Sequence, residues 1–166
     1  MKDIVVYLRV ERYIKQWLEN ALGNPVRFPA RSYENELLHR LLSRRPQGVQ
    51  PRLVAEPEEV AIVIPDRSDH KPEYYNYLSR RSQTAMVCAI DGLFRLALWS
   101  ECAPLIGSTA ELNAGIDEWC CRQGIDLDSR EAVRQKFYRM RKTYRLTGIV
   151  LGKTYGKQSP LTPSKK

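Results

Sequence analysis

Arginine and lysine side chains recur on one side of the segment 129–145, and together they could bind phosphate. Guanidinium and ammonium groups make charge-assisted hydrogen bonds with phosphate oxygens. On a helix, Val133, Phe137, Met140 and Tyr144 form an apolar stripe within an arc of about 60°. Arg134, Arg141 and Arg145 share a neighbouring face, about 100° around the axis from Val133. The side chains that we expect to contact nucleic acid are Ser129, Arg130, Arg134, Tyr138, Arg141, Lys142 and Arg145.

The positive charge of the chain is concentrated at its C-terminal end. The 166 residues carry a net charge of +8. Residues 130–166 contain 11 basic residues and one acidic residue, which gives +10, whereas residues 1–129 contain 16 basic and 18 acidic residues and stand at −2. Such asymmetry is typical of a polyanion-binding end. The alternative is a solvated basic face that serves only solubility.

Two helix-start signals place the basic segment in the second helix of a pair. Ser108 and Glu111 have the spacing of a capping box, and Gly124 stands where that helix would end. Asp128 begins a second signal of the same kind. An apolar stretch over 84–100 predicts a buried helix before the pair, so the three helices would form a trihelical, helix-turn-helix unit.

The segment 108–147 resembles the helix-turn-helix domains of bacterial and phage regulators and of mobile-element proteins, although its turn over 124–128 is longer than usual. The resemblance implies that the last helix docks on duplex DNA. The β-branched run within 146–156 could form a wing beside that helix or pack under the three helices.

The two ends of the basic helix should contact different parts of DNA. Recognition helices usually present their first turns to the bases. The residues that we expect at base edges are Ser129, Arg130 and Arg134, with Gln135 as a further candidate. Arg141, Lys142 and Arg145 lie later and fit phosphates better. Contact with about six phosphates would make log affinity fall with log salt at a slope near −5.

Residues before position 70 predict a small unit of mixed structure. The expected elements are strands at 4–10, 52–55 and 60–65, helices at 11–22 and 33–42, and an extended piece at 25–29. The polar stretch 66–72 contains a proline and is the expected boundary. The fold class is therefore α+β, with an α+β unit at 1–70, a mainly helical, helix-turn-helix-like unit at 71–157 and a disordered basic tail at 158–166.

Two further patterns could carry catalysis. Residues 7–10 resemble the Tyr-x-Arg-Val strand that opens the serine recombinase catalytic domain, but Glu11 stands where that family has its nucleophilic serine. Asp66, Asp69 and His70 could hold Mg²⁺ as in a nuclease, but their place in a short polar loop favours a linker. We therefore expect no catalytic residue, no metal site and no cofactor, and the protein is not expected to be an enzyme.

The cysteines and the hydropathy of the chain indicate the compartment in which we expect the protein. Cys88, Cys102, Cys120 and Cys121 form no C-x-x-C pair, and we interpret them as reduced thiols. No stretch is long and apolar enough to span a bilayer, and the N-terminus lacks the pattern of a signal peptide. A cytoplasmic location is expected.

These patterns favour a noncatalytic DNA-binding protein, either a transcriptional regulator or an accessory factor of a phage or mobile element. Its partner would be duplex DNA or another nucleic acid, without a membrane or a small-molecule substrate. A homodimer is expected by analogy, because pairing of half-sites raises affinity. The alternative is a structural or adaptor protein of a phage or mobile element, whose basic helix binds an acidic partner or RNA.

Overall fold

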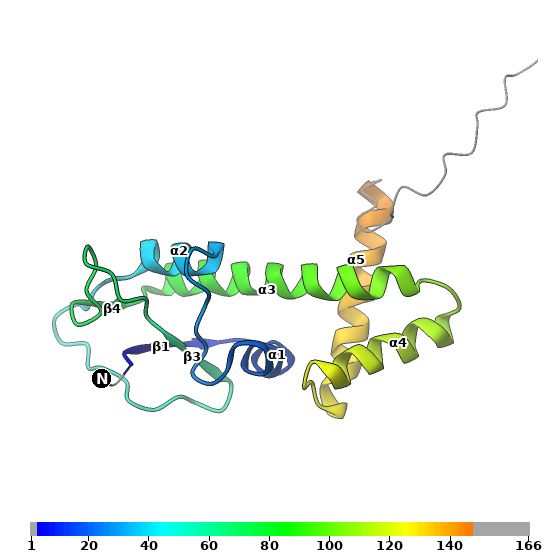
Figure 1. Ribbon diagram of the computed structural model, residues 1–166, viewed down its shortest axis with the longest axis horizontal. Helices are drawn as coiled ribbons and strands as arrows, with labels where there is room; N and C mark the ends of the chain where they lie inside the picture. Colours follow the sequence, from blue (N-terminus) through cyan, green and yellow to red (C-terminus); the bar gives the residue numbers. More distant parts are fainter. Residues whose placement is uncertain (1–2, 148–166) are drawn as a thin grey trace, which may run out of the picture.

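The computed structural model describes residues 3–147. Its longest helix, α3, runs across the molecule, with the strands and α2 along its N-terminal half and α4 and α5 along its C-terminal half (Figure 1). In chain order the elements are β1 (Val5–Arg9), α1 (Arg12–Leu22), α2 (Tyr33–Leu41), β2 (Ser43–Arg44), β3 (Glu59–Val63), β4 (Tyr75–Tyr77), α3 (Arg80–Cys102), the 3₁₀ turn η1 (Ala103–Leu105), α4 (Thr109–Arg122), the 3₁₀ turn η2 (Leu127–Ser129) and α5 (Arg130–Thr147). This mixture agrees with the expected α+β class.

The main sheet joins β1 and β3 as an antiparallel pair, from Val5 opposite Val63 to Arg9 opposite Glu59. The other edge of β3 is covered by Val26, whose N–H donates to the carbonyl of Ala61 at 2.8 Å. Strand β3 is paired on both edges and buried on both faces. This explains why its sequence is a nearly continuous apolar run and does not alternate between apolar and polar residues. The strands expected at 4–10 and 60–65 are therefore confirmed.

The strand expected at 52–55 is wrong. This segment has no regular structure, and the apolar side chains that suggested a strand, Leu53 and Val54, are 83% and 77% exposed. Strand β2 pairs instead with β4, which lies in the part of the chain that we expected to be mainly helical. Two and three residues are too few for a strand to be recognised from its own periodicity.

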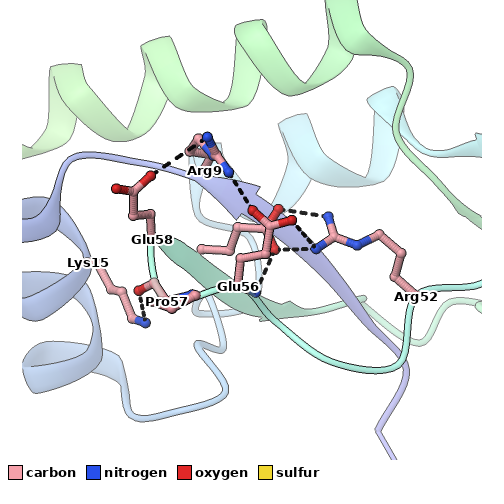
Figure 2. A network of polar contacts seen from close by, with 7 residues as sticks. Arg9, Lys15, Arg52, Glu56, Pro57 and Glu58 are labelled. Atoms are coloured by element: carbon pink, nitrogen blue, oxygen red, sulfur yellow. Dashed lines mark hydrogen bonds and ion pairs between the residues drawn. The ribbon is translucent and has the colours of Figure 1, made fainter.

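Polar contacts hold the irregular segment before β3 (Figure 2). Arg52 donates from both terminal nitrogens to the buried Glu59 carboxylate, at 2.7 and 2.6 Å, and the N–H of Glu56 donates to the same group at 2.9 Å. Arg9 pairs with Glu56 and Glu58. The hydrogen bond from Arg52 is the main cause that lowers the pKa of Glu59 below its ordinary value of 4.5, against the opposing effect of burial.

Helix α3 begins at Arg80, earlier than the apolar stretch 84–100 indicated. Ser79 caps it, because its side chain accepts a hydrogen bond from the N–H of Ser82 at 3.2 Å. The first turn is polar and therefore escapes a search for apolar periodicity. Asp91 and Arg95 are spaced i,i+4 on this helix, which predicts an ion pair, and the structure has it, with Arg95 Nε 2.7 Å from Asp91 Oδ2.

One continuous set of buried apolar side chains crosses the boundary expected at 66–72. Phe94 of α3 is central to it. Its ring centroid lies 5.2 Å from that of Tyr13, 5.3 Å from that of Trp17 and 5.7 Å from that of Trp119. The aromatic residues of α1 and α4 therefore meet on the same side chain of α3.

The capping box at the start of α4 is confirmed, since Ser108 and Glu111 exchange hydrogen bonds between side chains and backbone. Gly124 has a φ of +72°, the left-handed conformation that favours glycine after a helix. The start signal at Asp128 is misplaced, because Asp126 accepts the hydrogen bond from the Ser129 N–H at 2.9 Å. The expected wing at 146–156 extends beyond the described residues, and the tail at 158–166 lies outside them.

All four cysteines are free thiols. Burial raises the pKa of Cys102 to about 12 and that of Cys120 to about 11, whereas Cys88 and Cys121 are exposed.

Among the helices of residues 3–147, none combines the length and apolar character that crossing a bilayer requires.

Replacement of Glu59 by glutamine should lower the free energy of unfolding at pH 7 by about 2 kcal/mol, because a buried acceptor is replaced by a donor that faces Arg52. The matched control is Glu58→Gln, at a side chain that is 69% exposed, and we expect a loss below about 0.5 kcal/mol. Urea unfolding measures both values. Equal losses in the two variants would contradict the prediction.

The same comparison has a defined pH dependence. Because the pKa of Glu59 is lowered in the folded protein, its stabilising contribution is complete well above 4.5 and is lost as the pH falls through 4.5 and below. The difference in unfolding free energy between the wild type and Glu59→Gln should therefore shrink in acid. Unfolding curves at pH 7, 5 and 3.5 measure it, and a constant difference would be contrary to expectation.

Candidate nucleic-acid interface

The start of α5 is attached to the N-terminal part of the molecule. Ser129 is only 7% exposed. Asp126, in the preceding turn, accepts a hydrogen bond from the Gln16 side chain at 2.8 Å, donates its N–H back to Gln16 at 3.1 Å and pairs with Arg12 at 2.6 Å. Hydrogen bonds from Ser129 and Gln16 lower the pKa of Asp126. The turn is therefore held against α1.

Two side chains that we expected to face DNA form hydrogen bonds with α4. Arg134 donates from Nε to Asp117 Oδ1 at 2.8 Å, makes a second contact with the other carboxylate oxygen, and lies 3.3 Å from Glu131. The hydrogen bond to Asp117 is the largest cause that raises the pKa of Arg134. One turn later, Tyr138 Oη donates to Asn113 Oδ1 at 2.7 Å.

Lys136 and Arg130 are also partly withdrawn from solvent. Lys136 is 15% exposed, pairs with Asp91 of α3 and donates to Tyr13 Oη at 3.3 Å. Arg130 is half-buried, and its Nε has no hydrogen-bond partner among the described residues. Arg134 and Lys136 therefore join α5 to α4 and α3, whereas no such contact is seen for Arg130 within the described part of the chain. This placement differs from the expectation that Ser129, Arg130 and Arg134 reach base edges.

The second half of α5 carries the cations that face solvent. Arg139, Lys142 and Arg145 are exposed and Arg141 is half-buried, and none of the four forms an ion pair within residues 3–147. We call these four residues the basic end of α5. Three of them, Arg141, Lys142 and Arg145, line a shallow hollow of about 310 Å³ together with Tyr138. In the ribbon view this end of α5 projects past α3 (Figure 1).

The structure therefore divides the seven expected contact residues. It brings Tyr138, Arg141, Lys142 and Arg145 together on one flank and leaves the other three near the anchored start of the helix. Sequence reasoning did not place Arg139 among the contacts, and although it is exposed it lines a different hollow, together with residues of α1 and α3.

The acceptors on α4 were also missed. Asn113 and Asp117 are four residues apart, as are Arg134 and Tyr138, so each pair lies on one side of its helix. This matched spacing is visible in the sequence. The register of α4 against α5, which decides that the pairs meet, is not.

The unpaired cations around the hollow beside Tyr138 could bind an anion. They can accept a phosphate or another oxyanion through charge-assisted hydrogen bonds from two or more side chains. Arginine presents several donors in a fixed plane and is suited to phosphate, and the Tyr138 ring supplies an apolar wall.

No protein-family model, no curated protein and no solved structure matches this chain.

Replacement of Asp117 by asparagine should lower the free energy of unfolding by about 1 kcal/mol, because Arg134 loses its two-point carboxylate contact in a half-buried setting. Glu118→Gln is the control, since it removes the same charge one residue later from a side chain that is 74% exposed. We expect that change to cost less than about 0.5 kcal/mol. Chemical unfolding of both variants measures the difference, and an equal effect would show that Asp117 is an ordinary surface charge.

Proposed function

We propose that the protein binds duplex DNA through the basic end of α5, as a regulator or accessory factor of a phage or mobile element. The observation that carries the proposal is the group of four cations at one end of α5 that are unpaired within residues 3–147. Paired charges cancel at a distance, whereas unpaired charges of one sign produce the surface potential that attracts a polyanion.

The spacing along the helix supports a phosphate-bearing partner. Arg141 and Arg145 are one helical turn apart, about 6 Å along the axis. Phosphates of one DNA strand follow one another about every 3.4 Å along the duplex axis, roughly half that interval. Successive turns of the helix can therefore reach different phosphates of one strand.

This mode of binding would be led by the DNA backbone. Phosphate contacts position a protein on DNA but carry no sequence information of their own. Ser129 is buried and Arg134 is bound to Asp117, so the side chains best placed for base recognition in a helix-turn-helix arrangement are engaged elsewhere. We therefore propose binding that depends strongly on salt and only weakly on sequence.

The alternative partner is RNA or an acidic protein. The same cations would attract either one, and the half-buried Tyr138 ring would be compatible with a base as well as with a sugar. Duplex DNA is preferred because a projecting helix with cations on its flank is the shape that a groove accepts. Pairing of two copies on DNA stays a prediction.

The double variant Arg141→Gln/Arg145→Gln should bind a random duplex of about 20 base pairs about tenfold more weakly at moderate salt. Each lost phosphate contact should also reduce the dependence of log affinity on log salt by about 0.9, so the magnitude of the slope should fall by about 2. Fluorescence anisotropy at several salt concentrations gives both quantities.

The matched control is Arg80→Gln/Arg81→Gln. It removes the same charge from exposed residues at the opposite end of α3, so it should leave the slope nearly unchanged. Equal effects of the two double variants would mean that net charge alone attracts DNA, and the proposed interface would be wrong. Absence of duplex binding at low salt would refute DNA binding, and selective binding of single-stranded RNA would favour the alternative.

A further inference from the structure

Both histidines of the chain lie side by side on the face of the molecule that carries α2. His39 is in the last turn of α2, and His70 follows β3 in the loop that leads to β4. Their ring centroids are 4.6 Å apart, and the rings are nearly perpendicular. Asp69 completes the cluster, and one ligand atom from each of the three residues lies within 4.8 Å of the others.

Two nitrogen atoms of this cluster are buried without a hydrogen bond. His39 is only 7% exposed, and neither its Nε2 nor the Nδ1 of His70 has a hydrogen-bond partner among the described residues. An unsatisfied buried nitrogen is costly. Both atoms lie near the carboxylate of Asp69, His39 Nε2 at 3.4 Å and His70 Nδ1 at 3.6 Å.

These separations suit a tetrahedral metal ion. Zn²⁺ binds histidine nitrogen and carboxylate oxygen at about 2.0–2.2 Å, which places neighbouring ligand atoms about 3.4 Å apart. The two distances to Asp69 are of this size, with His39 Nε2 nearest to Oδ1 at 3.4 Å and His70 Nδ1 nearest to Oδ2, the other oxygen of the same carboxylate, at 3.6 Å. One ligand atom from each residue lies within 4.8 Å of the others, so these atoms must approach one another by up to about 1.4 Å to bind one ion, and the loop that carries His70 is at the surface.

The surrounding charges allow a divalent cation. Arg67 Nε lies 3.6 Å from Asp69, which would oppose a cation, but both oxygens of the Glu36 carboxylate accept hydrogen bonds from Arg67 at 2.9 Å. The Arg67 charge is thereby compensated. The ring of Tyr75 packs against His70 with centroids 4.3 Å apart and fixes its orientation.

We propose that His39 Nε2, Asp69 and His70 Nδ1 bind a Zn²⁺ ion. Two imidazoles and one carboxylate are a common zinc ligand set, and three protein ligands leave a fourth position for water. Asp69 is 55% exposed, which gives the ion a path from solvent. The ion would join the loop after β3 to α2. The sequence suggested a cluster of Asp66, Asp69 and His70, but the third ligand comes from a helix about thirty residues earlier, and Asp66 takes no part.

Isothermal titration of the metal-free full chain with ZnCl₂ at about pH 7.5 tests the site. We expect one ion per chain, and Asp69→Asn should weaken binding by at least about tenfold. Asp66→Asn is the matched control, because it makes the same change in an exposed carboxylate three residues earlier. Zinc at about a hundredfold excess over its dissociation constant should raise Tm by about 5 °C or more, and EDTA should reverse the rise.

Two further measurements separate this site from zinc binding at the cysteines. Cys88→Ser/Cys121→Ser removes the exposed thiols and should leave zinc affinity unchanged. With Co²⁺ in place of zinc, the wild type should show the intense visible absorption of a tetrahedral site, and His70→Gln should lose it. Circular dichroism confirms that each variant is folded. Absence of binding, binding that survives Asp69→Asn, or binding that disappears with the exposed cysteines would overturn the proposal.

Discussion

Phe94 lies where α1, α3 and α4 meet, and the position of α5 depends on that junction. Buried aromatic rings remove large apolar areas from water and favour tilted and edge-to-face contacts, as Tyr13, Trp17 and Trp119 make with Phe94. Farther along α3, Trp99 stacks on Phe137 of α5 with centroids 5.2 Å apart. Aromatic packing along a single helix therefore joins the strand-containing part of the molecule to the three-helix part.

The first half of α5 packs against other helices, and the second half exposes positive charge to solvent. In its first half, Arg134 and Lys136 are paired with carboxylates of α4 and α3, so they contribute little to the potential around the molecule. In its second half, the cations are unpaired within the described residues and determine the local field. A cation in the last turn, such as Arg145, also stabilises the negative end of the helix dipole. The same charge can thus support the helix and attract an anion.

Irregular segments of this protein are held by polar side chains. The segment before β3 is bound through Glu59, a buried carboxylate that accepts hydrogen bonds from Arg52 and from the backbone. The loop after β3 is bound to α2 by the pair of Arg67 with Glu36. In each case a charged side chain, paired with an opposite charge, holds a segment whose backbone lacks the regular hydrogen bonds of a helix or sheet. The cluster of His39, Asp69 and His70 would hold the loop after β3 to α2 in a similar way, through the proposed metal ion.

Local patterns in the sequence specify most of the helices, both strands of the main sheet and the capping box at Ser108, because these depend on residues within a few positions of one another. They also locate the excess of positive charge. They could not show that segment 52–55 stays irregular, since a strand needs a partner. Tertiary packing determines which of the described cations stay unpaired. Arg134 is neutralised by Asp117, which lies 17 residues earlier in the chain. The ring of His39 packs against that of His70, which lies about thirty residues later. Such pairings depend on how helices and loops are positioned against one another, and packing of the whole chain sets that register.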